Sequence, residues 1–140
     1  MIPTNADCLV YNDYGTGTGR RFIKHAIKDV YWDEIKGQNI ISMGVVTADS
    51  LKMFSDLKDN YISPEKWQLL APEDVPNYFT LQEGDILVFG TPDSPSEFTS
   101  AVKATQFFRD SAHIAHIISS IDIKFMPWSR DIHHFEIIGG

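Results

Sequence analysis

The residues best suited to chemistry are four histidines in the C-terminal part of the sequence. His113 and His116 are three residues apart, and His133 and His134 are adjacent. On an extended strand either spacing turns the two rings to opposite faces, because side chains alternate between the faces. No His-Glu-x-x-His motif and no nearby cysteine completes a zinc ligand set. We therefore expect no metal ion and no cofactor.

Carboxylates that could do acid–base work form two close pairs, Glu83 with Asp85 and Asp131 with Glu136. Asp85 ends a Gln-Glu-Gly-Asp segment typical of a tight turn, where aspartate is expected to bond the local backbone. No serine or cysteine stands in a recognisable nucleophile elbow. The only cysteine, Cys8, is expected to be a small core residue. The sequence therefore predicts no catalytic residue and no enzymatic activity.

A glycine-rich segment at Asn12–Gly19 looks like a phosphate-binding loop, because three of its glycines alternate with threonine. Its spacing matches neither the dinucleotide-binding pattern nor the P-loop pattern. We interpret this segment as a mobile connection between two strands of a hairpin.

The composition is that of a globular protein, with 43% hydrophobic and 12% aromatic residues in 140 positions. That length suits one domain, no apolar run approaches the ~20 residues of a membrane span, and no secretory signal is visible. A single cysteine excludes an internal disulfide and fits assembly in a reducing cytoplasm. The net charge of −7 argues against binding by neutralisation of phosphates but is compatible with DNA sliding past. The densest basic patch is only Arg20–Arg21.

Most elements that the hydrophobic pattern predicts are strands. They are Cys8–Tyr11, Asn39–Val46, Ser50–Phe54, Ile86–Phe89, Ile114–Phe125 and His133–Ile138. Thr47–Asp49 is expected to be the turn between the second and third of these. The last two are expected to form a hairpin at the closing edge of the sheet, joined by an irregular loop. Alternation places Ile117 and Ile121 on an apolar face and Ile118 on a mixed one.

Two short helices are predicted from their start signals. Ser63–Leu70 begins with serine as N-cap and proline at the first helical position. Ser94–Arg109 begins with a Ser-Pro-Ser-Glu capping box and has apolar residues at helical spacing. Arg20–Lys36 is ambiguous, since its apolar residues fit helical spacing and strand alternation alike. Periodicity slightly favours a helix there, whereas Val30-Tyr31-Trp32 favours a strand by residue type.

These elements together predict a mainly β protein: a small β-barrel or sandwich-like domain spanning residues 1–140, with one or two short helices. Flexible loops are expected near residues 12–19, 55–61 and 126–132, and the longer loops are the natural candidates for contacts with partners.

Four segments resemble, in order, motifs of a family of small head–tail proteins of tailed bacteriophages and prophages of Gram-positive bacteria. They are Val30–Trp32, Tyr61–Pro64, Tyr78–Gly90, and Ser129 with His134–Ile137 before the terminal glycines. The third is similar to the family's T-L-Q-x-G-D-I-I-V-x-G core. The sequence departs from the family at Phe135, where tryptophan is usual, and at Met126–Trp128, which reshapes the terminal loop.

The resemblance implies a structural virion protein of the phage neck, of the head-closure (stopper) type. Such proteins are small β-barrels that assemble as rings, here a hexamer or dodecamer. The ring would lie between the portal or adaptor and the tail terminator or tail tube, in a virion assembled in the host cytoplasm. Packaged DNA would pass through its lumen without sequence-specific binding, and no membrane is involved. The resemblance also favours a long strand over Arg20–Trp32.

Two alternatives remain open at the level of sequence. A tail-terminator or tail-completion protein is equally small, β-rich and ring-forming. A small β-barrel binding module or histidine-dependent metal enzyme belongs to a different class and would act through His113, His116, His133 and His134.

Overall fold

The computed structural model describes residues 4–41, 44–56, 58–124 and 134–139. Its strands are β1 (Ala6–Tyr14), β2 (Arg21–Ile41), β3 (Gly44–Asp56), β4 (Ile86–Phe89), β5 (Glu97–Phe98), β6 (Ala115–Lys124) and β7 (His134–Gly139). Two short α-helices, α1 (Pro64–Gln68) and α2 (Ala101–Asp110), accompany the 3-10 turns η1 (Gly17–Gly19) and η2 (Val75–Asn77). The protein is mainly β, as predicted. No helix in the described part of the chain is long and apolar enough to cross a membrane.

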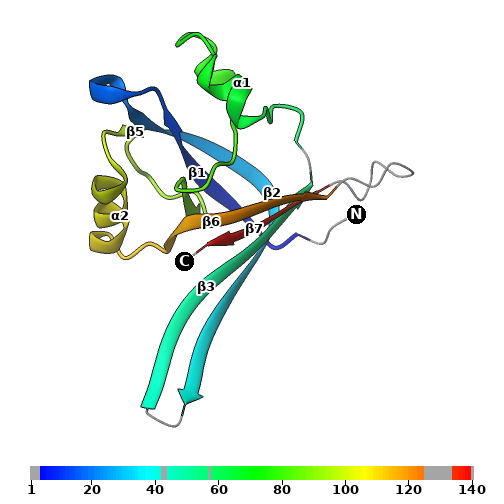
Figure 1. Cartoon of the computed structure of the whole chain (residues 1–140), viewed down its shortest axis with the longest axis vertical. Helices are drawn as coiled ribbons and strands as arrows, with labels where there is room; N and C mark the ends of the chain where they lie inside the picture. The colour runs from blue at the N-terminus through cyan, green and yellow to red at the C-terminus, as the bar shows by residue number, and fades with distance from the viewer. Residues whose placement is uncertain (1–3, 42–43, 57, 125–133, 140) are drawn as a thin grey trace.

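The strands pair in the order β1-β4-β6-β7-β3-β2, and β2 pairs with β1 again. All of these pairings are antiparallel. Because β2 pairs with both β3 and β1, the sheet curls into a nearly closed barrel (Figure 1). The short β5 adds to the other edge of β2. Closure of this kind removes most open strand edges from the body of the protein.

The long β2 pairs with two strands in succession along its length. Its first half pairs with β1 and its second half, from Tyr31, pairs with β3. At the changeover β2 carries an extra residue relative to β1, and Asp29 has a left-handed φ of 60°. The strand prediction is confirmed, and the helix favoured by periodicity is wrong. Ile27 and Val30 are three residues apart, as on one face of a helix, yet both lie in the barrel core because the extra residue falls between them.

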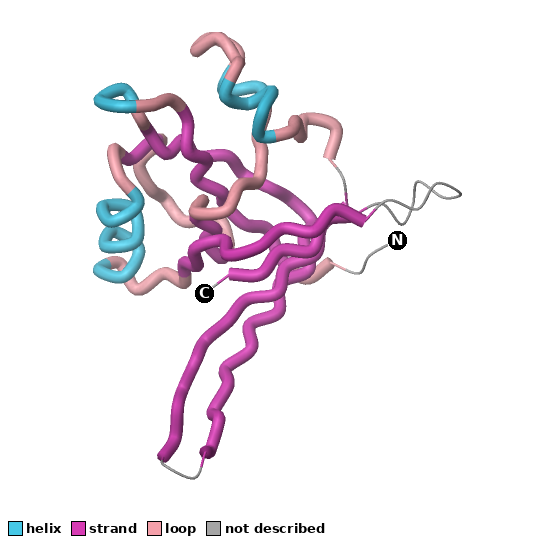
Figure 2. Tube along the Cα trace, in the orientation of Figure 1, coloured by secondary structure: helices cyan, strands magenta, loops and turns pink. Residues whose placement is uncertain are grey.

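The hairpin between β2 and β3 extends well beyond the barrel. Its ladder runs without interruption from Tyr31↔Phe54 to Ile41↔Gly44, whereas β7 pairs with β3 only along residues 51–56. Residues 35–41 and 44–50 therefore form a two-stranded ribbon that projects from the body, here called the arm (Figures 1 and 2). The turn predicted at residues 47–49 is wrong, because those residues pair with residues 36–38. The chain reverses between Ile41 and Gly44.

The terminal hairpin of β6 and β7 is present as predicted, but not at an edge. β7 lies between β6 and β3 and so completes the ring of strands. Because the register shifts between Ile118 and Ser120, the predicted faces of β6 are wrong before the shift, whereas Ile121 after it packs against the core as predicted. Ile118 is 1% exposed in the barrel core, while Ile117 is 43% exposed. The loop predicted at 126–132 lies outside the described residues.

Two apolar clusters form the core. One fills the barrel and includes Cys8, Trp32, Met53, Leu81 and Leu87, while the other lies between the barrel and α2. Burial of large apolar side chains in both is the main stabilising term for so small a fold.

The helix predicted at residues 94–109 starts later than its capping box indicates. Ser100 is the N-cap of α2, and its hydroxyl accepts a hydrogen bond from the Lys103 N–H (3.2 Å). The residues before it form β5 against β2, and Phe98 packs on Tyr11 with ring centroids 5.1 Å apart. Tertiary pairing therefore overrides the local capping signal. The helix predicted at 63–70 is confirmed as α1, with Ser63 as N-cap and Pro64 in the first turn.

Candidate functional site

Only two of the four histidine candidates have side chains in the described part of the chain. His116 is buried, and its Nε2 lies 3.3 Å from Glu34 Oε1, which also accepts a hydrogen bond from Trp32 Nε1 (3.0 Å). His113 is exposed before the start of β6. The side chains of His133 and His134 are not among those that the structure describes. In the described part of the chain, no group of three or more His, Cys, Asp or Glu residues could hold a metal ion.

The remaining candidates are Cys8 and the two carboxylate pairs. Cys8 is fully buried, and burial raises the pKa of its thiol to about 12, so it is the core residue that the sequence predicted. Glu83 is exposed in its turn, whereas Asp85 is fully buried. Asp131 and the side chain of Glu136 lie outside the described residues. Only Asp85 therefore merits a closer description.

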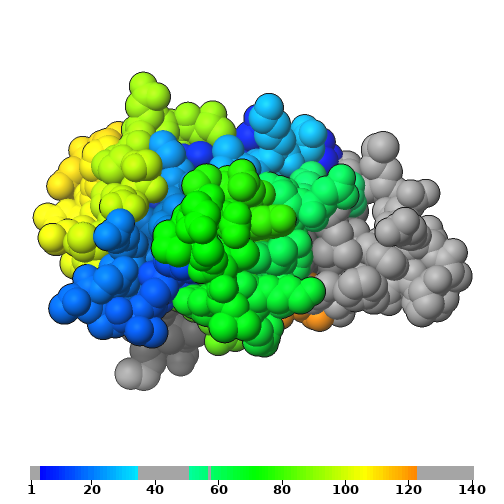
Figure 3. Space-filling view, turned by 90° about the horizontal axis from the view of Figure 1, so that it is seen from above, coloured from blue at the N-terminus to red at the C-terminus, as the bar shows by residue number. Residues whose placement is uncertain are grey.

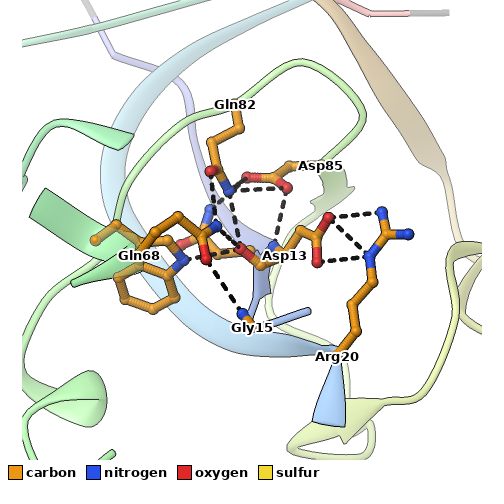
Figure 4. Close-up of polar contacts among 8 residues, drawn as sticks. Asp13, Gly15, Arg20, Gln68, Gln82 and Asp85 are labelled. Carbon is orange, nitrogen blue, oxygen red and sulfur yellow. Dashed lines mark hydrogen bonds and ion pairs between the residues drawn. The ribbon is translucent and has the colours of Figure 1, made fainter. Parts of the chain in front are cut away.

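The Asp85 carboxylate lies at the centre of a buried polar network (Figure 4). It accepts hydrogen bonds from Asn12 Nδ2 (2.8 Å), the Asp13 N–H (2.9 Å) and Gln82 Nε2 (3.1 Å). The prediction that Asp85 bonds only its local backbone is wrong, since two of these donors belong to β1. The carboxylate therefore joins the 82–85 turn to the end of the first strand.

Asp13 extends the polar network from β1 to α1 and to the connection after β1. Its carbonyl oxygen accepts from Trp67 Nε1 (2.9 Å), Gln68 Nε2 (2.8 Å) and Gln82 Nε2 (3.1 Å). Its carboxylate binds Arg20 Nε and Nη2, at 2.9 and 2.6 Å. The segment expected to be a mobile loop is thus bonded at both of its ends.

Asn12 completes the polar network from inside the barrel wall. Its Nδ2 donates to the Thr80 carbonyl (2.6 Å), and its Oδ1 accepts from the Thr80 N–H (3.1 Å). A fully buried asparagine is stable only with such bonds, because unpaired buried amides are costly. The sequence interpretation missed Asn12 by placing it in a loop. The available signal was its position directly after an apolar strand.

Burial dominates the electrostatics of Asp85. It raises the pKa of the carboxyl from 3.8 to about 7, although the hydrogen bonds from Asp13, Asn12 and Gln82 act to lower it. Because its neighbours also bond to the surrounding chain, we interpret the polar network as structural. It holds α1 and the β1–β2 connection against the barrel.

This polar network also explains the T-L-Q-x-G-D motif that carries much of the family resemblance. Thr80 and Gln82 supply polar network atoms, and Gly84 has a φ of +90° that favours glycine. Gly84 and Asp85 then bond the backbone of Ile118 on β6. The motif therefore contributes to the fold through this polar network.

A surface groove of about 510 Å³ lies beside the polar network, between the β1–β2 connection, the loop after α1 and β5. Its lining includes Tyr14, Arg21 and Val75. The segment that contains α1, coloured green, lies across the centre of the face of the molecule seen in Figure 3. Arg21 already pairs with Glu97 (3.4 Å), and Lys24 Nζ donates to the Ser94 carbonyl (2.8 Å). The groove therefore offers contact area and no evident acid–base pair.

The arm is the second candidate surface. Two-stranded ribbons are marginally stable alone in water and usually gain from a further strand or a packed face. In the described part of the chain, residues 35–41 of β2 pair only with β3, and residues 44–50 of β3 pair only with β2. The arm thus offers two open edges to a partner.

Comparison with known families places the chain in one of them. A family model described as a family of unknown function (DUF6751) matches residues 3–140, and the chain belongs to that family. Searches of curated proteins and of solved structures gave no match.

Proposed function

We propose that this protein is a structural component of a bacteriophage neck, of the head-closure type, which acts as a ring between the portal or adaptor and the tail. The observation that carries the proposal is the ordered series of four motifs in the sequence, from Val30 to Ile137. It is a proposal for an assembly protein without enzymatic activity or cofactor.

Two features of the fold are compatible with this role. A small barrel with a projecting arm offers separate surfaces for neighbours within a ring and for the rings on either side. The acidic net charge of −7 would favour a lumen past which DNA can move, because phosphates are not held by a basic surface.

The test is a virion preparation from a phage that encodes this chain. We expect a neck ring in electron microscopy, with density that fits the barrel and arm, and labelling of that ring by an antibody to the chain. Virions in which the chain is absent from the neck would contradict the proposal.

A deletion of the gene distinguishes head closure from the alternative role of tail terminator. Loss of a head-closure protein should leave tails of normal length beside heads that have lost DNA. Loss of a terminator should instead give tails of irregular length. The second outcome would replace the head-closure assignment by the terminator one.

A further inference from the structure

The direction of backbone groups along the arm follows from bonds at its base. The Val30 carbonyl accepts from the Asn5 N–H, and the Trp32 N–H donates to the Asn5 side chain, so both residues direct their backbone groups away from β3. Successive residues of a strand point these groups to opposite edges. Beyond Trp32, the outward groups of β2 on the arm are therefore those of Lys36, Gln38 and Ile40.

The same alternation applies to β3. Tyr31 directs its backbone groups at its partner Phe54, so Phe54 and every second residue before it point to β2. Met53 and Leu51 face the other way, where they pair with β7. Past the end of β7, the outward groups of β3 are those of Val45, Thr47 and Asp49. Each edge of the arm thus presents a short row of donors and acceptors with no partner among the described residues.

Copies of the chain can cover both edges of every arm when unlike edges pair. A two-fold dimer that pairs like edges covers one edge and leaves the other open. In a cyclic ring with arms side by side, the β2 edge of each copy meets the β3 edge of the next, and every edge is covered. All arms then point the same way, so adjoining strands of neighbours are antiparallel, as β2 and β3 already are within one arm.

We propose that the arms of neighbouring subunits join through these edges, β2 of one copy to β3 of the next, in a continuous antiparallel sheet. This inference rests on the ring assembly of the proposed function and identifies its lateral contact. The partner is a second copy of this chain, and the recognition is main-chain hydrogen bonding.

Charge supports a self-contact at the arm more than at the body. Residues 35–50 contain one lysine and one aspartate, Lys36 and Asp49, so the arm is neutral. The whole chain has a net charge of −7, which therefore resides outside the arm. Copies repel each other through their bodies, and the arm is where close approach costs least.

Proline substitutions test the two edges separately. Gln38→Pro removes an outward N–H of β2, and Thr47→Pro removes one of β3, while neither takes a bond from the arm's own ladder. In analytical ultracentrifugation of the full chain, the wild type should assemble with increasing concentration and each proline variant should remain monomeric. Gln38→Thr keeps the N–H and should assemble like the wild type. Circular dichroism should show that all variants are folded.

Mixing the two variants gives the sharpest result. Gln38→Pro retains a good β3 edge and Thr47→Pro retains a good β2 edge, so an equimolar mixture should form dimers and nothing larger. Dimers of Thr47→Pro alone would mean that like edges pair, and would overturn the proposal.

A wild-type chain that stays monomeric, or a Gln38→Pro chain that assembles like the wild type, would also overturn the edge pairing. Neither result bears on whether the chain is in the virion neck, since that is decided by microscopy of virions. Absence of the chain from the neck would in turn contradict the function and leave the sedimentation result standing.

Discussion

The polar network at one end of the barrel and the arm at the other differ in how their hydrogen bonds are used. In the polar network, the groups of Asn12, Asp13 and Asp85 bond to partners within the same chain. In the arm, the backbone groups of alternate residues in both strands face edges that no described strand covers. The first region closes its hydrogen bonds within the chain, whereas the second leaves outward backbone groups available for the lateral contact that we propose.

This difference separates stability from assembly. Changes in the polar network should lower the free energy of unfolding and leave the outward edges of the arm intact. Changes at the edges of the arm should abolish association and leave the barrel folded. A variant that changed both the free energy of unfolding and the association would contradict this separation.

The largest effect is expected from removing the arm. Replacing residues 36–49 with Asn-Gly joins Ile35 to Ser50, which are already opposite each other, through a two-residue turn. We expect complete loss of association in sedimentation experiments. The unfolding free energy of the barrel should change by less than about 1 kcal/mol, because the deleted residues pair only with one another. A shortened chain that still forms rings would contradict the role of the arm.

Within the barrel, Asp85→Ala should have the largest effect. It leaves the Asp13 N–H without its acceptor and removes one of the two acceptors of the buried Asn12 Nδ2, which costs about 3 kcal/mol in chemical denaturation. Glu83→Ala, two residues away and exposed, is the matched control and should stay within about 0.5 kcal/mol of the wild type. Equal losses in the two variants would show that the polar network does not stabilise the fold.

The pH dependence of stability should reveal two opposed groups. Burial raises the pKa of Asp85 to about 7, so the folded state favours the protonated carboxyl. Its contribution to the free energy of unfolding is present below about pH 4 and is lost as the pH rises through 7. Burial lowers the pKa of His25 from 6.5 to about 4, so its contribution is present above pH 6.5 and is lost as the pH falls through 4. In the wild type these two slopes oppose each other.

Two variants should separate these slopes. Relative to the wild type, Asp85→Asn should gain stability as the pH rises from 4 to 7, and His25→Gln should lose it. Urea denaturation at several pH values measures both. If the free energy of unfolding changed with pH in the same way in the wild type and both variants, these pKa shifts would be contradicted.

The smallest effect is expected from Arg20→Ala. Its ion pair with Asp13 is short, at 2.6 Å, but the Arg20 side chain is 55% exposed, so solvent screens the interaction. We expect a loss of stability well below that of Asp85→Ala in chemical denaturation, and unchanged association. A loss as large as that of Asp85→Ala would mean that the β1–β2 connection contributes as much as the buried part of the polar network.

The sequence predicted the fold class because most strands carry strong local signals. The β4 strand, the 82–85 turn and the terminal hairpin all follow from residue type and turn chemistry. The turn at 47–49 failed because Thr47 and Asp49, polar residues typical of turns, are paired inside the arm. The capping box at Ser94 failed because β5 pairs with β2 across more than seventy residues.

The candidate surfaces were harder to predict than the fold. The partners of Asp85 are distant in sequence, and no spacing rule indicates that a buried asparagine will lie beside them. The open edges of the arm depend on where β7 ends relative to β3, which only tertiary structure determines.

Amide hydrogen exchange along the arm tests the central claim most directly. In dilute monomer, the outward amides of Lys36, Gln38 and Thr47 should exchange rapidly, while the inward amides of Asn39 and Val46 should be protected by the arm's own ladder. In the assembled protein, the outward amides should become protected on both strands together. Outward amides that still exchange freely in the assembled protein would contradict edge-to-edge pairing of the arms.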